Sequence, residues 1–274
     1  MRRLLPRTRT RAFWIVVGLT ALGAVLRFAT LGLQSYHHDE IVTASRVLRV
    51  GFGHAMDAVG FSESAPPLYY ALAWVWTQVT GTGEWGLRSL SALAGVATIP
   101  VAYLIGRELR GCRTGLLAAA LVAVNPMLIW YSQEARAYAL LAFFCALSLY
   151  YCVRALREDG RDEGRSLVAW GIFSALALAT HYFAVFPLVA EVLLLLRRRG
   201  RAAWQGLWIV ALVTLLLVPL VIHQTSYGHA EWIGKFSLGH RLGETAITFM
   251  VGETGDIIGQ AERAGPALVP LALV

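Results

Sequence analysis

The chain has 274 residues, of which 57% are hydrophobic and only 15% are charged, and its mean hydropathy is +0.58. This balance excludes an ordinary soluble domain and is typical of a protein that crosses a membrane several times. The net charge of +7 comes almost entirely from arginines in short loops between apolar runs. That placement indicates membrane topology and argues against nucleic-acid binding.

The N-terminal residues 1–11 carry five arginines and precede the first apolar run, residues 12–33. The run is too long for the core of a signal peptide, and no small-residue cleavage pattern follows it. We therefore predict a cytoplasmic basic N-terminus and an uncleaved first span. Arg27 lies in the last third of this run, where two interpretations stay open: a side chain that snorkels to the outer interface, or an inward-facing contact to a phosphate.

The later apolar runs predict an all-α, polytopic bundle with about seven spans, because helices satisfy their own backbone groups in lipid. Residues 34–65 form the first outer loop, with interfacial helical structure between residues 39 and 59. The run 66–81 is short and rich in Tyr and Trp, so we assign it to a juxtamembrane helix and not to a span. The remaining spans are expected at residues 87–105, 116–131, 137–156, 167–180, 183–196 and 204–222.

Residues 223–263 then form a second long outer loop in this scheme. A further apolar run, residues 264–274, is too short to cross a hydrocarbon core of ~30 Å. It predicts the start of a further span and hence a truncated last helix.

Arginines gather in four places along the chain: residues 1–11, 107–113, 154–165 and 197–201. If all four lie in the cytoplasm, the polar residues of the transmembrane module 12–222 collect on the opposite side of the membrane. Polar groups at membrane depth are expensive without a function. The pattern therefore predicts a multi-pass protein of the plasma (inner) membrane whose active site faces the extracytoplasmic side.

The first outer loop opens with His37-His38-Asp39-Glu40, and we predict that Asp39 and Glu40 are catalytic. A carboxylate can take the proton from an acceptor hydroxyl as that hydroxyl attacks an anomeric carbon. Adjacent side chains point in different directions, so one of the two leads, and we assign the general base to Asp39. The structural alternative for Asp39 is a helix N-cap.

Other polar residues on the same side are candidates for binding the substrate or the donor. Arginine suits a departing phosphate because it can contact the phosphate through two N–H groups. If a helix begins at residue 133, Glu134 and Tyr138 share one of its faces. The candidates are Arg27, Arg88, Gln133, Glu134, Arg136, Tyr138, His181, Tyr182, Lys235 and Arg241.

Structural roles stay open for several of these candidates. Arg88 suits an interfacial anchor, Glu134 and Arg136 suit a structural pair, and His181 suits a satisfied polar residue. Glu63 is interpreted as a loop residue. The histidines lack the tight spacing of a metal site, so no cofactor is assigned and a divalent metal is left open. No glycine-rich phosphate loop is visible, which favours a lipid-linked donor over a nucleotide sugar.

Five motifs together resemble one family. Leu26-Arg27 leads into Asp39-Glu40, and Thr180-His181-Tyr182 follows near the end. Between them lie Pro66-Pro67-Leu68-Tyr69-Tyr70, Trp85-Gly86-Leu87-Arg88 and, most specific, Tyr131-Ser132-Gln133-Glu134-Ala135-Arg136-Ala137-Tyr138-Ala139-Leu140. In this order the chain resembles the N-terminal part of the protein-O-mannosyltransferase-like, integral-membrane glycosyltransferases of the GT-C class. That class also includes the lipid A aminoarabinose transferase.

The resemblance implies that Asp39 is the catalytic base, that the donor is a polyprenyl-phosphate sugar, and that the reaction takes place outside the cytoplasm. Members of the family usually continue with more spans and often with a soluble outer domain. We therefore predict an inverting glycosyltransferase that moves a hexose or pentose to a lipid, glycan or protein acceptor. Its partners are the donor, the acceptor and membrane lipids, with no nucleic acid.

Two alternatives stay open. A transporter or flippase for a polyprenyl-linked substrate also places charges in a membrane cavity, although such proteins more often show inverted repeats and broken helices at mid-membrane. The second alternative is an inactive fragment with a binding or assembly role.

Overall fold

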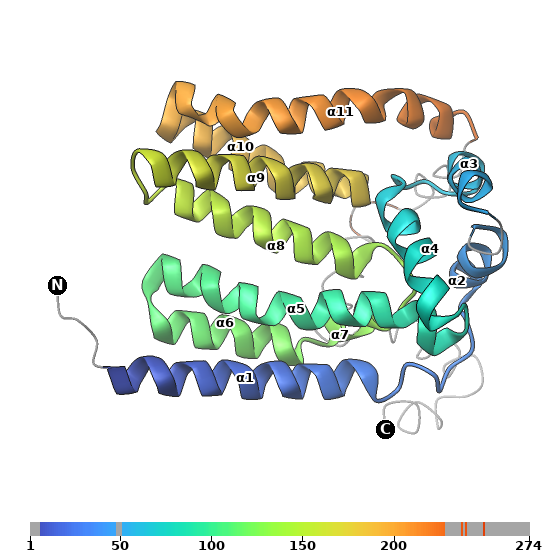
Figure 1. Ribbon diagram of the computed structural model, residues 1–274, viewed down its shortest axis with the longest axis horizontal. Coiled ribbons are helices and arrows are strands. Elements are labelled where there is room, and N and C mark those ends of the chain that lie inside the picture. Colours follow the sequence, from blue (N-terminus) through green and yellow to red (C-terminus); the bar gives the residue numbers. More distant parts are fainter. Residues whose placement is uncertain (1–5, 48–50, 228–236, 238, 240–248, 250–274) are drawn as a thin grey trace.

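A computed structural model of the chain describes residues 6–47 and 51–227, and the single residues 237, 239 and 249. Within these ranges every regular element is a helix, as the sequence predicts. The long helices of the bundle lie side by side along the long axis of the molecule (Figure 1). They are α1 (Pro6–Phe28), α5 (Glu84–Arg110), α6 (Cys112–Val124), α8 (Tyr138–Ala155), α9 (Arg161–Thr180), α10 (Val185–Arg199) and α11 (Trp204–Thr225).

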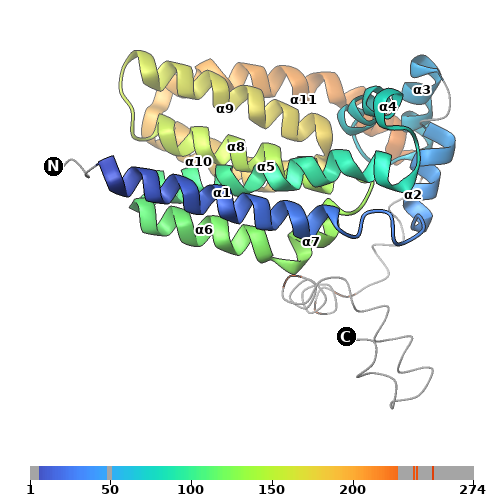
Figure 2. The ribbon, with the colours of Figure 1, turned by 60° about the horizontal axis from the view of Figure 1, so that its bottom comes forward.

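Shorter helices gather at one end of this bundle, away from the start of α1, and Figure 2 shows the same arrangement from a second side. In the region 39–59 the described residues form α2 (His38–Val42), a π-helical turn (Thr43–Val47) and most of α3 (Phe52–Ser62). The next helix, α4 (Leu68–Thr80), runs across the bundle and not along it (Figure 1). Its course and its 13 residues agree with a juxtamembrane helix at 66–81.

The chain is a multi-pass membrane protein. Among the described residues, four stretches are long and apolar enough to cross a membrane, or five if the bent pair of α6 and α7 (Pro126–Ser132) forms one span. The last stretch, Tyr182–Thr225, holds both α10 and α11. The number of seven spans stays a prediction.

Residues 116–131, which the sequence predicts as one span, are divided between α6 and α7. The chain bends by 57° between α6 and α7. Pro126 has no N–H group and its ring disfavours a helical conformation for Asn125, which is extended (φ −64°, ψ 122°). The Asn125 side chain instead accepts a hydrogen bond from the backbone N–H of Leu128 at 2.9 Å and caps α7. The bend redirects the following residues toward α2.

The two ends of the bundle differ in charge. The turns that join α5 to α6, α8 to α9 and α10 to α11 all lie at the end where α1 begins (Figure 1). These turns carry the arginine clusters 107–113, 154–165 and 197–201. Helices α2 to α4 and the turn between α7 and α8 lie at the opposite end (Figure 1). The fold therefore separates the arginine clusters from the candidate site residues, as the sequence predicts.

Close packing between helices depends on glycine where α9 meets α11. A Cβ atom added to Gly171 would lie only 2.5 Å from the backbone oxygen of Gly206. Because real Cβ atoms do not approach a carbonyl so closely, any side chain at this position forces the two helices apart. Gly18 in α1 differs, since a Cβ atom there would meet nothing within 4 Å.

We expect Gly171→Ala to lower the free energy of unfolding by about 1–3 kcal/mol through overpacking. Gly18→Ala should be neutral or stabilise by up to about 1 kcal/mol, because alanine favours a helix over glycine. Thermal unfolding of both variants in the same detergent measures this difference. Equal midpoints for the two variants would show that the close contact of α9 with α11 is not a constraint.

Candidate active site

The turn between α7 and α8, residues 133–137, lies at the centre of the candidate site. Gln133 reaches α1, where its Nε2 donates to the oxygen of Leu26 at 3.0 Å and to Oγ1 of Thr30 at 2.7 Å. The backbone N–H of Ala135 donates to Glu40 in α2, and the Arg136 side chain reaches Glu63. One short segment thus connects α1 with the first outer loop. It is not the start of a helix, so Glu134 and Tyr138 do not share a helical face as expected.

Glu40 and Arg88 form a buried ion pair. The Nε and Nη2 atoms of Arg88 donate to the two carboxylate oxygens of Glu40 at 2.9 and 2.7 Å. Arg88 uses its other N–H groups on the backbone oxygens of Leu31, Gln34 and Ser35 at 2.9, 2.8 and 3.1 Å. All five guanidinium donors therefore have a partner within the protein. Arg88 ties the exit of α1 to α5, and it is neither exposed at an interface nor available to a phosphate in this arrangement.

The carboxylate of Glu40 also has hydrogen-bond partners for both of its oxygens. Besides Arg88, it accepts hydrogen bonds from the backbone N–H groups of Ala135 at 2.7 Å and His37 at 2.9 Å. Burial alone would raise the pKa of Glu40, but the Arg88 side chain and these two N–H groups hold its pKa below the ordinary value. Glu40 is therefore charged at neutral pH and has its acceptor positions filled. It acts on the site by fixing the position of α2.

Asp39 lies beside Glu40 but in a different environment. The N-cap of α2 is His37, so the capping alternative for Asp39 does not apply. The Asp39 side chain is 59% exposed, and its Oδ2 lies 4.0 Å from Nη2 of Arg136. Such an open carboxylate can meet a substrate, whereas Glu40, with 2% of its side chain exposed, cannot.

A third carboxylate, that of Glu63, holds the side chain of Arg136 in place. Its Nη1 donates to Glu63 at 3.1 Å and to Thr43 at 3.3 Å. Glu63 also accepts a hydrogen bond of 2.7 Å from the hydroxyl of Tyr70, and its side chain is only 4% exposed. Burial alone would lower the pKa of Arg136, but the nearby tyrosines and carboxylates hold its pKa above the ordinary value. The result is a fixed cation next to the open carboxylate of Asp39.

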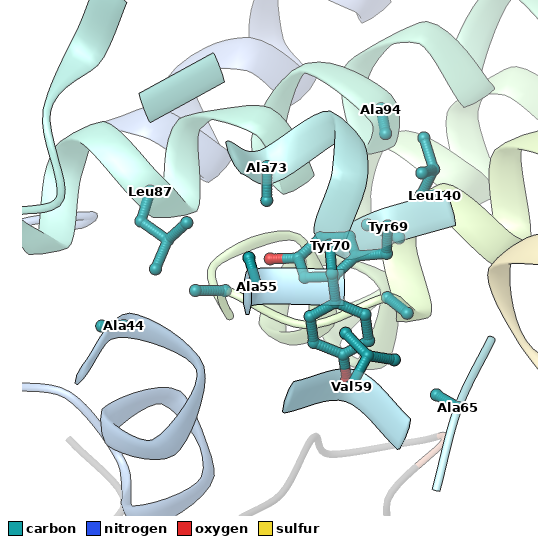
Figure 3. Packing of buried hydrophobic residues seen from close by; sticks show 13 residues of the cluster. Ala44, Ala55, Val59, Ala65, Tyr69, Tyr70, Ala73, Leu87, Ala94 and Leu140 are labelled. Atoms are coloured by element: carbon teal, nitrogen blue, oxygen red, sulfur yellow. The ribbon is translucent and has the colours of Figure 1, made fainter. Parts of the chain in front are cut away.

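A cluster of small and aromatic side chains supports this polar group. Tyr69 and Tyr70 of α4 lie at its centre, and Val59 of α3 and Leu140 of α8 pack around them (Figure 3). Both tyrosine side chains are almost completely buried. Because the cluster joins α3, α4, α5 and α8, it fixes the position of Glu63 relative to the turn at 133–137.

Arg27 matches neither interpretation drawn from the sequence. It is completely buried, so it does not snorkel to an interface. Its guanidinium donates to the backbone oxygens of Gly23, Val122 and Ala123 at 3.1, 2.9 and 3.0 Å, and to Oγ of Ser132 at 3.2 Å. Arg27 thus binds the carbonyl groups near the C-terminal end of α6, where the helix bend leaves them without helical partners.

The remaining candidates line the same end of the bundle. Glu134 accepts a hydrogen bond of 2.9 Å from the indole of Trp130. Tyr138 lies against the ring of His181, with ring centroids 5.6 Å apart. Burial, and secondarily the charge of Arg136, lowers the pKa of His181 to about 4, so this ring is neutral at pH 7. Tyr182 points elsewhere and donates to Gln224 of α11 at 2.8 Å.

Lys235 and Arg241 lie outside the described residues. Residues 6–47 and 51–227 contain no group of three or more His, Cys, Asp or Glu side chains placed to hold a metal ion.

The sequence reasoning missed three residues of the site. Glu63 was interpreted as a loop residue, and Thr43 and Tyr70 were not singled out, yet all three hold Arg136 or its partner. The available signal for Glu63 was an acidic residue just before Pro66-Pro67 in an apolar chain. No local pattern indicates Thr43, because its role depends on contacts with Glu63 and Arg136, which lie 20 and 93 positions away in the sequence.

Comparison with known families identifies the chain. The model of the dolichyl-phosphate-mannose-protein mannosyltransferase family matches residues 64–223, more than half of the sequence. The chain belongs to this family. The match includes Arg88, Arg136 and His181.

A named bacterial protein and a solved structure are also similar to this chain. The Bacillus subtilis (strain 168) protein named "Putative mannosyltransferase YkcB" is 27% identical over 127 residues, which cover 46% of this chain and 18% of that protein. The fold is similar to that of ArnT from Cupriavidus metallidurans, with a TM-score of 0.67 for the apo structure and 21% identity. That match covers 96% of this chain and 54% of ArnT.

Two further structures of the same fold carry ligands. ArnT bound to undecaprenyl phosphate matches with a TM-score of 0.63 and 21% identity over 94% of this chain and 53% of that one. The Saccharomyces cerevisiae protein O-mannosyltransferase Pmt1-Pmt2 complex, bound to the sugar donor, matches with a TM-score of 0.61 and 20% identity. That match covers 83% of this chain and 35% of that one. The chain therefore spans about half of the length of these relatives, or less.

Arg88→Ala should lower the free energy of unfolding by about 3–5 kcal/mol, because it leaves the buried carboxylate of Glu40 without its partner. The matched change Arg107→Ala breaks a pair with Glu108 that is largely at the surface and should cost at most about 1 kcal/mol. Thermal unfolding in detergent checks both values. A double change, Glu40→Gln with Arg88→Ala, should recover part of the loss, and a failure to recover any would contradict the pairwise explanation.

Acid should weaken the protein through His181. The folded protein keeps this ring neutral down to about pH 4, whereas the unfolded chain binds the proton near pH 6.5. The unfolded state therefore binds more protons between these values, and stability falls as the pH is lowered from about 6.5 to about 4. Unfolding midpoints over this range should fall less steeply for His181→Gln than for the wild type. Parallel pH profiles would mean that His181 is not kept neutral.

Proposed function

We propose that the protein is a glycosyltransferase that moves a hexosyl or pentosyl group from a polyprenyl-phosphate donor to a hydroxyl acceptor, with inversion. The observation that carries the proposal is the difference among three neighbouring carboxylates. Glu40 and Glu63 are buried and committed to arginines, with 2% and 4% of their side chains exposed, while Asp39 is 59% exposed. Asp39 is thus the carboxylate of this group that an acceptor can reach.

The proposed reaction uses Asp39 as general base. As the acceptor oxygen forms its bond to the anomeric carbon, its proton passes to the carboxylate of Asp39. The bond between the anomeric carbon and the phosphate oxygen breaks, and the electron pair leaves with the polyprenyl phosphate. Attack from the side opposite to the leaving group inverts the anomeric carbon. A phosphate leaves readily, so the step does not need a strong general acid.

Arg136 is the proposed cation of the described site that meets the substrate. The Arg136 side chain is 18% exposed and faces Asp39. The N–H groups of Arg27 and Arg88 instead donate hydrogen bonds to other groups of the protein. A fixed guanidinium stabilises the charge that grows on a departing phosphate without reorganising during the reaction. Tyr138 and the neutral ring of His181 lie next to it and would form an uncharged wall for the sugar. Lys235 and Arg241 are proposed as further donor contacts.

A lipid-linked donor is supported by the relatives. The ArnT structure contains undecaprenyl phosphate, and the yeast complex contains its sugar donor. The separation of the arginine clusters from the site supports an extracytoplasmic reaction, because such clusters mark the cytoplasmic side. We propose the plasma (inner) membrane as the location of the protein, and a lipid, glycan or protein as the acceptor.

Asp39→Asn should lower the rate of sugar transfer by about 10²–10⁴-fold, the contribution expected of a general base. The matched control is Asp57→Asn, which removes an exposed carboxylate from the neighbouring α3. The assay follows transfer from a synthetic polyprenyl-phosphate sugar in membranes that contain equal amounts of each variant.

A wild-type rate for Asp39→Asn would show that another group is the base. Movement of the lipid-linked substrate across proteoliposomes without any sugar transfer would instead favour a transporter.

A further inference from the structure

An open groove lies at the arginine-rich end of the bundle, at the opposite end from Asp39. It is formed by the first turns of α9 and the start of α11, and its volume is about 550 Å³. The proposed glycosyltransferase chemistry does not involve any residue of this groove. Its lining comprises Gly160, Arg161, Gly164, Arg165, Val168, Ala169, Ile172 and Gln205.

The groove follows from how α9 and α11 pack. The two helices touch closely at Gly171 and Gly206. One to two turns nearer the arginine-rich end, Gly164 presents no side chain, and Gln205 of α11 lies over it, with Oε1 2.9 Å from the position of an added Cβ atom. The missing side chain leaves a hollow beside Gln205 that opens outward.

The charge lining this hollow is positive. Arg161 and Arg165 are four residues apart on one face of α9, and both line the groove. Neither acidic residue of the same turn lines it. Glu163 lies 3.6 Å from Arg199 of α10, and Asp162 lies 3.4 Å from Arg165 in an exposed pair that contributes little. The groove thus offers two guanidinium groups to an anion.

The rest of the groove is apolar and leads toward the middle of the bundle. Val168 and Ile172 continue the same face of α9 by one and two turns and are 38% and 43% exposed. Ala169 lies between them and leaves room for a chain. In a helix that lies in a membrane bundle, this strip faces the hydrocarbon and the arginines face the headgroup layer.

We propose that this groove binds an anionic phospholipid. Arg161 and Arg165 hold the phosphodiester headgroup, and an acyl chain lies along Val168, Ala169 and Ile172. A zwitterionic lipid offers the same chains without net charge, and free phosphate offers the charge without the chains. Because Gln205 of α11 also lines the groove, the bound lipid contacts both α9 and α11 and therefore stabilises the folded bundle.

The test uses the purified full chain in detergent, with phosphatidylglycerol as the probe and phosphatidylcholine and inorganic phosphate as comparisons. Native mass spectrometry measures the affinity for each lipid, and thermal unfolding measures the stabilisation. The wild type should bind phosphatidylglycerol more tightly than phosphatidylcholine and should gain stability from it, whereas phosphate alone should give no gain.

The variants separate the headgroup site from general positive charge. Arg161→Gln should weaken phosphatidylglycerol binding by about fivefold, and the double change with Arg165→Gln by about 30-fold. The matched control is Arg110→Gln with Arg113→Gln, which removes two arginines from the same end of the bundle outside the groove. This control should bind as the wild type does.

Ala169→Phe tests the acyl-chain strip without changing the charge, and it should also weaken phosphatidylglycerol binding. Unfolding midpoints without lipid identify any variant that is itself destabilised. The single change Arg165→Gln then replaces a destabilised double variant, and Ala169→Leu replaces a destabilised Ala169→Phe. Three results would overturn the proposal: an equal loss in the Arg110/Arg113 control, unchanged binding in Ala169→Phe, or full stabilisation by phosphate alone.

Discussion

The candidate site depends on the buried ion pair of Glu40 and Arg88. An arginine taken out of water is costly unless all its donors are used, and here the carboxylate and three loop carbonyls use all five. The pair therefore permits few arrangements of the chain that leaves α1. It fixes α2 against α5, and the N–H of Ala135 on the same carboxylate fixes the turn before α8. The position of Asp39 is therefore set by the contacts of Glu40, the next residue in the chain.

Three carboxylates that lie close together thus differ in exposure and in hydrogen bonding because their surroundings differ. Glu40 is saturated by hydrogen bonds, Glu63 is buried under Arg136, and Asp39 faces outward. Glu63 and Thr43 hold Nη1 of Arg136, and Nη2 faces Asp39 at 4.0 Å. This arrangement keeps an open carboxylate and a guanidinium side by side, as proton abstraction next to a departing phosphate requires.

The two ends of the bundle also differ in how their arginine side chains are paired. Helices α2 to α4 lie at one end of the bundle, and the turns between the long helices lie at the other end (Figure 1). The first end holds the buried polar network of Glu40 and Arg88, and the turns at the other end carry arginines that are mostly exposed. Arginines at the first end spend their donors on carbonyl groups and carboxylates, as Arg27 and Arg88 do. Arg161 and Arg165 instead line an open groove, where a ligand from the membrane can reach them. Arg27 and Arg88 are therefore structural, whereas Arg161 and Arg165 are available to a ligand.

Apolar run lengths determined the all-α membrane fold, and the arginine pattern determined that the polar candidates share one end, because both signals are local and set by the bilayer. The motif at 131–140 was sufficient to indicate the family, whereas the catalytic role assigned to Asp39 stays a prediction. Only the tertiary structure decided which charged groups are free. Whether Arg88 is an anchor, a phosphate ligand or the partner of Glu40 depends on residues 48 positions away in the sequence. Glu63 gains its role only when α3 and α4 bring it under Arg136, since desolvation and pairing are properties of a packed neighbourhood and not of a sequence motif.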